Sequence, residues 1–580
     1  MSRTFVKRFS DLLKNRQGKE AMELFMMEDS EIISNNLSDV MPLAAQYLTE
    51  SNLQRDQEHF LCCKTIVNTA ARMYNPMETV LEVLEEIEHV RLHVESHVKF
   101  FAMLEPLGIC LTRMINKGKN IYWCLEPLRM YIQSLHTWTP DDEEATEDGT
   151  MNVYREVLLF LTPLVDKAVE VNSKREDGSL LGDSLLSFLI FLHGRLSMTS
   201  RVTVEKELLE KMMPLTLCLT GDPLYFLDVV GRRYRNVCNR SRDVDLRRTV
   251  NEKRNILFES KRNISDLAYA NFYFNLITKE QYWRYVPQVY NLSYILEKCT
   301  YLFHTFLQVR REVFGWKGLI FMENVIQRVP RRSVSSEMLE LTIYLDIFKP
   351  IISIMILSDN SDARKKALDV FRGYIELFNM EARYSVLSYL YEIAEHSGLL
   401  SLVTGIFKSS ITECLDSAPR NHRFLGKNME VLLKKVCNLP HGSSSDVVEI
   451  SDEIITALNL LRYLFIKDED NETGIWSIVD AIENDYLKPL KEGIHMSKGY
   501  WRVKIKDLEH QKKRYNQKTD YEEMKREDAK VTLTVGGEQL PVMPLADKIS
   551  FCHRALNGLD VMESILIRVD ECISTGKALR

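Results

Sequence analysis

The chain has 580 residues, of which 45% are apolar and 27% are charged, and its net charge is -7. This balance argues against a nucleic-acid-binding protein, because such proteins are usually strongly basic. The low numbers of glycine (23) and proline (16) argue against all-β and dinucleotide-binding folds and favour long helices. Phosphate-binding glycine loops, H-E-x-x-H and zinc-finger spacings are missing from the sequence. We therefore expect a protein that is not an enzyme and needs no cofactor.

The cysteines indicate a reducing compartment. There are 11, an odd number without a C-x-x-C pair, and most lie in apolar helical runs, as Cys110, Cys218 and Cys437 do. We expect them to be reduced and buried. Residues 1–8 contain no apolar signal core, and the most apolar run, 351–357, is shorter than the roughly 20 residues that cross a bilayer. The sequence predicts a cytoplasmic protein, with the nucleus as a second location and no membrane partner.

Three histidines in the first helical region could in principle bind a metal ion. His89, His93 and His97 are spaced i, i+4 and i+8, so they share one helix face, and a pair at i and i+4 can hold zinc. Glu95 lies off that face and no further ligand is evident. A histidine face packed on a neighbouring helix is the favoured interpretation, and no metal site is predicted.

Three charge runs follow along the chain. Residues 141–148 are acidic and predict a loop, and residues 504–530 mix both signs and predict an exposed helix or linker. Residues 232–254 are basic. A solvated loop and helix surface is the favoured interpretation of this basic run, and an acidic protein partner or a phosphate group is the alternative. Few aromatic residues interleave with it, so no nucleic-acid partner is predicted.

The string Gly182-Asp183-Ser184-Leu185 matches a motif of one esterase family. With Asp507 and His510 further along, Ser184 could form a nucleophile system. The context argues against this, because such a nucleophile follows a strand in an α/β domain, whereas Ser184 precedes an apolar helix at 185–192. We expect Ser184 to be a helix N-cap or loop residue, and esterase activity remains the alternative.

Apolar residues recur at helical spacing through most of the chain. In 361–375 the residues Ala367, Phe371, Tyr374 and Ile375 share a face, and in 451–465 the stripe is Ile454, Leu458, Leu461 and Phe465, with Ser451 as the expected N-cap. Short polar breaks separate such helices. Successive amphipathic helices bury their apolar faces by stacking on one another, as in HEAT and armadillo arrays. No strict sequence period of about 40 residues occurs, so this prediction rests on helix succession.

Near the end of the chain, 531–535 and 538–540 flank Gly536-Gly537 and predict a small hairpin, followed by a long helix over 544–573. The predicted fold class is therefore all-α, a HEAT-like helical-repeat solenoid with one small β-hairpin near the C-terminus. We expect an N-terminal helical-repeat region at residues 1–260 and a C-terminal HEAT-like region at 261–580.

Residues 459–498 hold the densest combination of aromatic residues, basic residues and turns, which are typical of interface hot spots. This segment resembles the glomulin family. The resemblance is carried by L-N-L-L-R-Y-L at 458–464, I-K-D at 466–468, T-G-x-W at 473–476, I-E-N at 482–484, L-K-P-L at 487–490 and M-S-K at 496–498. R-K-K at 364–366, H-S-G at 396–398 and the expected hairpin stand in the same order. The convincing match covers about 265–573.

The resemblance implies a HEAT-like solenoid whose C-terminal half binds the RING subunit of cullin–RING ubiquitin ligases, together with the cullin. There it would cover the surface that receives the ubiquitin-conjugating enzyme, so inhibition would be steric. An adaptor that binds an immunophilin or a receptor tail is the alternative. From residue type we expect an aromatic and apolar centre with a basic rim. The candidate contact residues are Arg420, Arg423, Phe424, Trp476, Tyr486, Lys488, Lys491, Met496 and Lys498.

Overall fold

The structure is a computed structural model, and it describes residues 2–92, 97–116, 121–135, 144–172, 179–196, 202–227, 266–515, 534–535, 538–539 and 544–580. The chain forms two compact units. The first is Met1–Arg328 with Pro350–Ala367, and the second is Val329–Lys349 with Leu368–Arg580. The predicted region boundary at 260/261 lies in 228–265, outside the described residues, so it stays a prediction.

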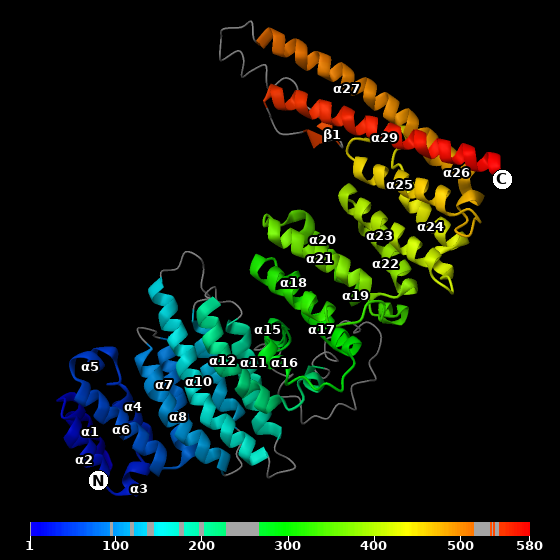
Figure 1. Cartoon of the computed structure of the whole chain (residues 1–580). Helices are drawn as coiled ribbons and strands as arrows, with labels where there is room; N and C mark the ends of the chain where they lie inside the picture. The colour runs from blue at the N-terminus through cyan, green and yellow to red at the C-terminus, as the bar shows by residue number, and fades with distance from the viewer. Residues whose placement is uncertain are drawn as a thin grey trace. The chain divides into compact units, whose positions relative to one another are not determined.

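The first unit is built from successive helices that pack on one another (Figure 1). In its first helix Phe5, Phe9 and Leu13 lie one turn apart and are all buried, so one apolar face of the helix packs inward. Helix α2 packs on α6, α7 on α8, α8 on α10, and α11 on both α12 and α15. The helices are α1 (Ser2–Lys14), α2 (Gly18–Met27), α3 (Ser30–Ser34), α4 (Leu37–Ala45), α5 (Glu50–Arg55), α6 (Gln57–Met73), α7 (Pro76–Leu92), α8 (Val98–Asn116), η1 (Tyr122–Leu125), α9 (Glu126–Ser134), α10 (Glu144–Asn172), α11 (Ser179–Leu196), α12 (Val202–Thr220), α15 (Asp266–Thr278), α16 (Glu280–Trp283), α17 (Leu292–Gln308) and α18 (Glu312–Ile326).

The second unit continues this helix-on-helix packing: α22 packs on α23, α23 on α25, α25 on α29, and α29 on α27. Helices α20 and α21 are divided between the two units. The remaining elements are η4 (Ser336–Glu340), α19 (Ile343–Asp346), α20 (Phe348–Leu357), α21 (Ser361–Leu377), α22 (Met380–Ile393), α23 (Ser397–Asp416), η5 (His422–Phe424), α24 (Gly426–Val436), η6 (Gly442–Ser444), α25 (Ser451–Lys467), η7 (Ile475–Ile478), α26 (Val479–Ile482), η8 (Glu483–Leu487), α27 (Lys488–Tyr515) and α29 (Leu545–Leu579).

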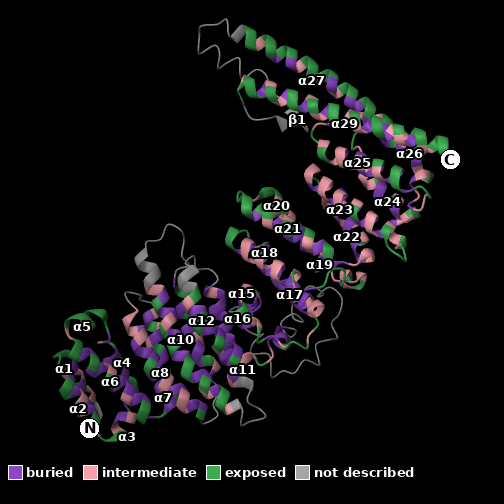
Figure 2. Ribbon diagram, in the orientation of Figure 1, coloured by how far each residue is buried: buried purple, intermediate pink, exposed green. Residues whose placement is uncertain are grey.

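The predicted helix stripes are confirmed. All four stripe residues of α25 and all four of α21 are buried (Figure 2). Helix α25 packs against α23 and α29, and Phe371 and Tyr374 of α21 contact the ring of Phe348 in α20. The long last helix is also confirmed, with Pro544 at its N-cap. One detail of α25 is wrong: Ile450 occupies the N-cap position, and Ser451 is the first helical residue.

Three further expectations differ from the structure. The acidic run at 141–148 is not all loop, because α10 begins at Glu144. Ser184 is not an N-cap but a buried residue inside α11, because this helix begins several residues earlier, at Ser179. Cys218 is exposed, although it lies in an apolar run of α12.

The ten cysteines within the described residues are free thiols, and burial raises the pKa of Cys110 and of Cys437 to about 12.

Two short strands lie where a hairpin was expected. β1 (Thr534–Val535) and β2 (Glu538–Gln539) pair antiparallel, with Thr534 opposite Gln539 and Val535 opposite Glu538. The Gly536-Gly537 turn and the flanking residues lie outside the described part of the chain, so the hairpin as a whole stays a prediction.

Within the described part of the chain one helix, α23, is long and apolar enough to cross a membrane by length and composition alone. It packs on both α22 and α25, and Ser401 and Thr412 on α23 make side-chain hydrogen bonds to Thr456 and Tyr463 on α25. These contacts join α23 to its neighbours in the helical array, where apolar residues serve the packing between helices.

Candidate partner-binding site

The loop between α25 and η7 is held by one buried carboxylate. Asp468, at the C-cap of α25, accepts hydrogen bonds from the backbone N–H groups of Glu472 and Thr473, each at 2.8 Å, and from the Thr473 hydroxyl. Gly474 adopts φ 81°, and a Cβ there would lie 3.2 Å from the Cα of Gly426. A side chain at Gly474 would therefore be strained twice, by conformation and by contact. These contacts hold the loop against the C-terminal end of α25 and against Gly426.

Trp476 joins this loop to the last helix. Its indole Nε1 donates to the Asp468 carbonyl at 3.0 Å, and its ring lies edge-on to Phe465 with centroids 4.9 Å apart. The Arg580 guanidinium stacks over the indole at 4.5 Å from the centroid. Trp476 is half-buried. It is first a packing residue, and only its remaining exposed part could meet a partner.

Tyr486 cannot contact a partner in this structure, which corrects its assignment to the centre of the contact surface. It lies in the π-helical turn η8 and is only 2% exposed. Burial, together with the nearby Cys437 and Glu453, raises the pKa of its hydroxyl well above 10. The π-helical turn aims this ring inward, and the spacing of residues in the sequence does not show that turn.

The same correction applies to Phe424. It is fully buried, with its ring 5.8 Å from Tyr384 and 6.1 Å from Phe407. Its neighbour Arg423 is half-buried and donates to Glu381 at 3.1 Å. Arg420 is exposed and forms an ion pair with Glu472. Both arginines are therefore engaged within the chain, and a partner would have to compete for them.

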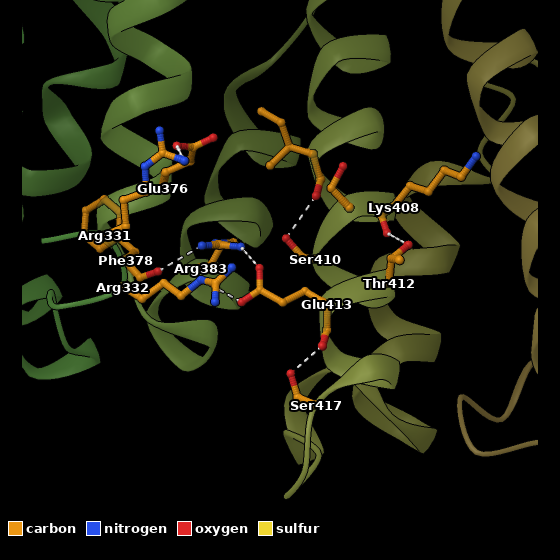
Figure 3. A network of polar contacts seen from close by, with 12 residues as sticks. Arg331, Arg332, Glu376, Phe378, Arg383, Lys408, Ser410, Thr412, Glu413 and Ser417 are labelled. Atoms are coloured by element: carbon orange, nitrogen blue, oxygen red, sulfur yellow. Dashed lines mark hydrogen bonds and ion pairs between the residues drawn. The ribbon is translucent and has the colours of Figure 1, made fainter. Parts of the chain in front are cut away.

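A network of ion pairs beside the loop that bears Arg420 was not anticipated from the sequence (Figure 3). Glu413, near the end of α23, lies between two arginines, with Arg332 at 2.9 Å and Arg383 at 3.1 Å. Arg383 is buried and also donates to the Phe378 carbonyl at 3.3 Å. The network fixes the C-terminal end of α23, from which the loop bearing Arg420 leaves. Its members come from a loop before η4 (Arg332), from α22 (Arg383) and from α23 (Glu413), so no local sequence signal identifies them.

The predicted lysines on α27 have different environments. Lys498 is only 6% exposed and its ammonium is hydrogen-bonded to Asp560 and Glu563 of α29, so it is a packing residue and not part of an outer rim. Lys491 is exposed and lies 4.0 Å from Asp570. Lys488 is exposed and donates to Asn484 at 2.6 Å. Only Lys488 and Lys491 remain available at the surface.

Met496 belongs to an exposed apolar stripe that the sequence-based assignments missed. Met496, Tyr500 and Val503 are spaced i, i+4 and i+7 on α27 and are 51%, 50% and 60% exposed. The opposite face of α27 is buried against α29 through Leu490, Ile494, Trp501, Ile505 and Leu508. The spacing alone could have identified the stripe, but two apolar faces on one helix do not show which face is covered.

Basic residues flank this stripe on one side. On an α-helix of 3.6 residues per turn, Lys488, Arg502 and Lys506 lie along the edge next to Met496 and Val503, and all three are exposed. We call this set of six residues the α27 face. An apolar centre with a charged rim is the composition of a protein-docking surface.

The remaining candidates do not assemble into a site. His97 Nδ1 is hydrogen-bonded to the Tyr131 hydroxyl at 2.7 Å, and His93 lies outside the described residues. Across the described residues no group of three His, Cys, Asp or Glu side chains could hold a metal ion. Ser184 is fully buried in α11, whereas Asp507 and His510 are exposed on α27. The basic run at 232–254 lies outside the described part of the chain.

The helix-on-helix packing and the exposed α27 face define a helical-repeat scaffold. A family model described as "Uncharacterised protein family, YAP/Alf4/glomulin" matches residues 23–552. The chain belongs to this YAP/Alf4/glomulin family. It is 26% identical to the human (Homo sapiens) protein glomulin over 566 residues, which covers 96% of this chain and 90% of that protein. It is 27% identical to mouse (Mus musculus) glomulin over 519 residues, covering 88% of this chain and 83% of that protein.

Among solved structures, yeast importin-beta (Kap95p) matches 97% of this chain and 68% of its own, with 12% identity and a TM-score of 0.23. So low a score carries no argument, and the description of the fold rests on the packing of the helices themselves.

Proposed function

We propose that this protein inhibits cullin–RING ubiquitin ligases by binding the RING subunit and blocking access of the ubiquitin-conjugating enzyme. The proposal rests on membership of the YAP/Alf4/glomulin family and on the resemblance of 458–498 described above. No bond is made or broken by this chain in such a mechanism. Its site of action would be the cytoplasm and the nucleus, and its free thiols are consistent with a reducing compartment.

The observation that carries the proposal is the exposed stripe of the α27 face. Three apolar side chains on one helix face are each at least half exposed, and a contiguous exposed apolar surface of this kind often marks a protein-binding site. A RING surface that receives a conjugating enzyme offers a shallow apolar groove with polar edges, and a stripe of this composition complements it. Because α27 is packed on α29 along its length, the stripe is already ordered before binding, which lowers the entropy cost of association.

The experiment is ubiquitin-chain formation by a neddylated cullin–RING complex in the presence of the full-length protein. We expect inhibition by the wild type. Met496→Gln with Tyr500→Gln should raise the concentration needed for half-inhibition at least about tenfold, because both side chains lie in the centre of the proposed contact. Full inhibition by this double variant would remove the α27 face from the mechanism.

The matched control is Val561→Gln on α29, a residue as exposed as Met496 (50%) but on another helix. It should inhibit as the wild type does. If the wild type neither binds nor inhibits the complex, the ligase proposal is wrong. The adaptor alternative, with an immunophilin or receptor tail as partner, stays a prediction that binding assays with those partners would test.

A further inference from the structure

The first unit carries an open groove between α2 and α6 that the proposed function does not use. The two helices approach closely at Gly18, where a Cβ would lie 2.9 Å from His59 Nδ1 and 3.0 Å from the Cβ of Cys62. Next to this contact lies a pocket of about 480 Å³. It is lined by Met22, Gln57, Glu58, Leu61, Cys62 and Thr65.

Exposed apolar side chains extend this groove beyond the pocket. Met26 lies one turn beyond Met22 on the same side of α2 and is 60% exposed, and Leu61 on α6 is 49% exposed. Methionine side chains are flexible and polarizable, so a methionine-lined surface can adapt to the shape of a partner.

The rim of the groove is acidic. Two exposed carboxylates, Glu23 on α2 and Glu58 on α6, lie beside the groove with one exposed ammonium, that of Lys19, which is itself paired with Glu58. This charge argues against a second copy of the chain on the groove, because two acidic rims would face one another, and against an anionic lipid surface. It favours a positively charged occupant.

We propose that the α2/α6 groove binds a basic amphipathic helix of a partner protein. The apolar side of that helix would lie on Met22, Met26 and Leu61, as a third helix packs into the groove between two others. Its lysine or arginine side chains would meet Glu23 and Glu58 at the rim. The groove lies in the first compact unit and the α27 face in the second, so this binding site is separate from the proposed ligase site.

The test is fluorescence anisotropy with the full-length protein and a labelled helical peptide of leucine and lysine only, its leucines on one face. The comparison peptide has glutamate in place of lysine. We expect the basic peptide to bind and Met22→Gln with Leu61→Gln to weaken binding at least about tenfold. Glu23→Gln with Glu58→Gln should weaken it and flatten its salt dependence.

The matched control is Met73→Gln, an α6 residue that is 60% exposed and does not line the pocket; it should bind as the wild type does. Met22 is half-buried and the other substituted side chains are exposed, so the melting temperature should change little. A melting curve like that of the wild type then separates loss of binding from unfolding. Equal binding by the groove variant, or equal binding of the acidic peptide, would overturn the proposal. So would a dimer in sedimentation that the groove variant abolishes.

Discussion

Arg580, at the end of α29, stacks over the indole of Trp476 at 4.5 Å, and Gly576 one turn earlier lies against the same ring. A methyl group on Gly576 would overlap the indole. The last turn of the final helix and the loop between α25 and η7 are therefore held together through one tryptophan, and this contact orders the end of the unit that carries the α27 face.

Gly576→Ala should lower the stability of the second unit by about 1–3 kcal/mol, because the indole must move to make room. Gly558→Ala on the same helix is the matched control. A Cβ there meets nothing within 4 Å, so it should raise stability by up to about 1 kcal/mol. Chemical denaturation followed by tryptophan fluorescence measures both, and equal behaviour of the two variants would contradict the packing described for Trp476.

Tyr486→Ala should destabilise the second unit by about 3–5 kcal/mol, as expected for a large buried ring. Loss of ligase inhibition by this variant would then report unfolding and not a lost contact. Circular dichroism and limited proteolysis distinguish the two cases. A Tyr486→Ala protein that keeps its native stability but loses partner binding would show that the ring reaches the partner after all.

Helical spacing in the sequence predicted which residues share a helix face, but it did not predict which aromatic residues are buried. The helix stripe of Ile454, Leu458, Leu461 and Phe465 was predictable because helical spacing alone determines which residues share a face. Tyr486 and Phe424 were misassigned because aromatic residues are enriched both in cores and at interfaces. Only tertiary packing separates the two roles.

The environments of the predicted basic rim residues could not be read from the sequence, for a different reason. Lys498 finds its carboxylates on α29, and Arg423 finds Glu381 on α22, partners too distant in sequence for any local pattern to reveal. Conversely, the Met496–Tyr500–Val503 stripe was present in the spacing but was hidden by the second apolar face of the same helix, which packs on α29.

Lys498→Met should lower stability by about 1–2 kcal/mol, because it leaves Asp560 and Glu563 close together without a cation between them. Lys488→Met is the control: Lys488 is exposed and its ammonium donates to the exposed Asn484, so the change should stay within about 0.5 kcal/mol. Thermal melting of both variants at low and high salt is the measurement. A stable Lys498→Met protein would show that the ion pairs of the buried Lys498 ammonium with its exposed carboxylates contribute little.

Glu453 gives the second unit a pH dependence. Burial, followed by repulsion from Glu449, raises the pKa of its carboxyl to about 7. The folded state therefore keeps a proton that the unfolded chain has already lost, so stability falls as pH rises from about 4.5 to about 7. Glu453→Gln should remove this loss and raise the melting temperature at pH 8 but not at pH 4. An equal effect at both pH values would contradict the raised pKa.

In the proposed mechanism the α27 face and a ubiquitin-conjugating enzyme compete for the same surface of the RING subunit. The most direct measurement is binding of labelled full-length protein to a cullin–RING complex while unlabelled conjugating enzyme is added. Competition predicts that the apparent dissociation constant rises linearly with the concentration of conjugating enzyme. It also predicts that Met496→Gln with Tyr500→Gln weakens binding when no conjugating enzyme is present. An apparent dissociation constant that stays constant while both proteins occupy the complex would contradict the claim.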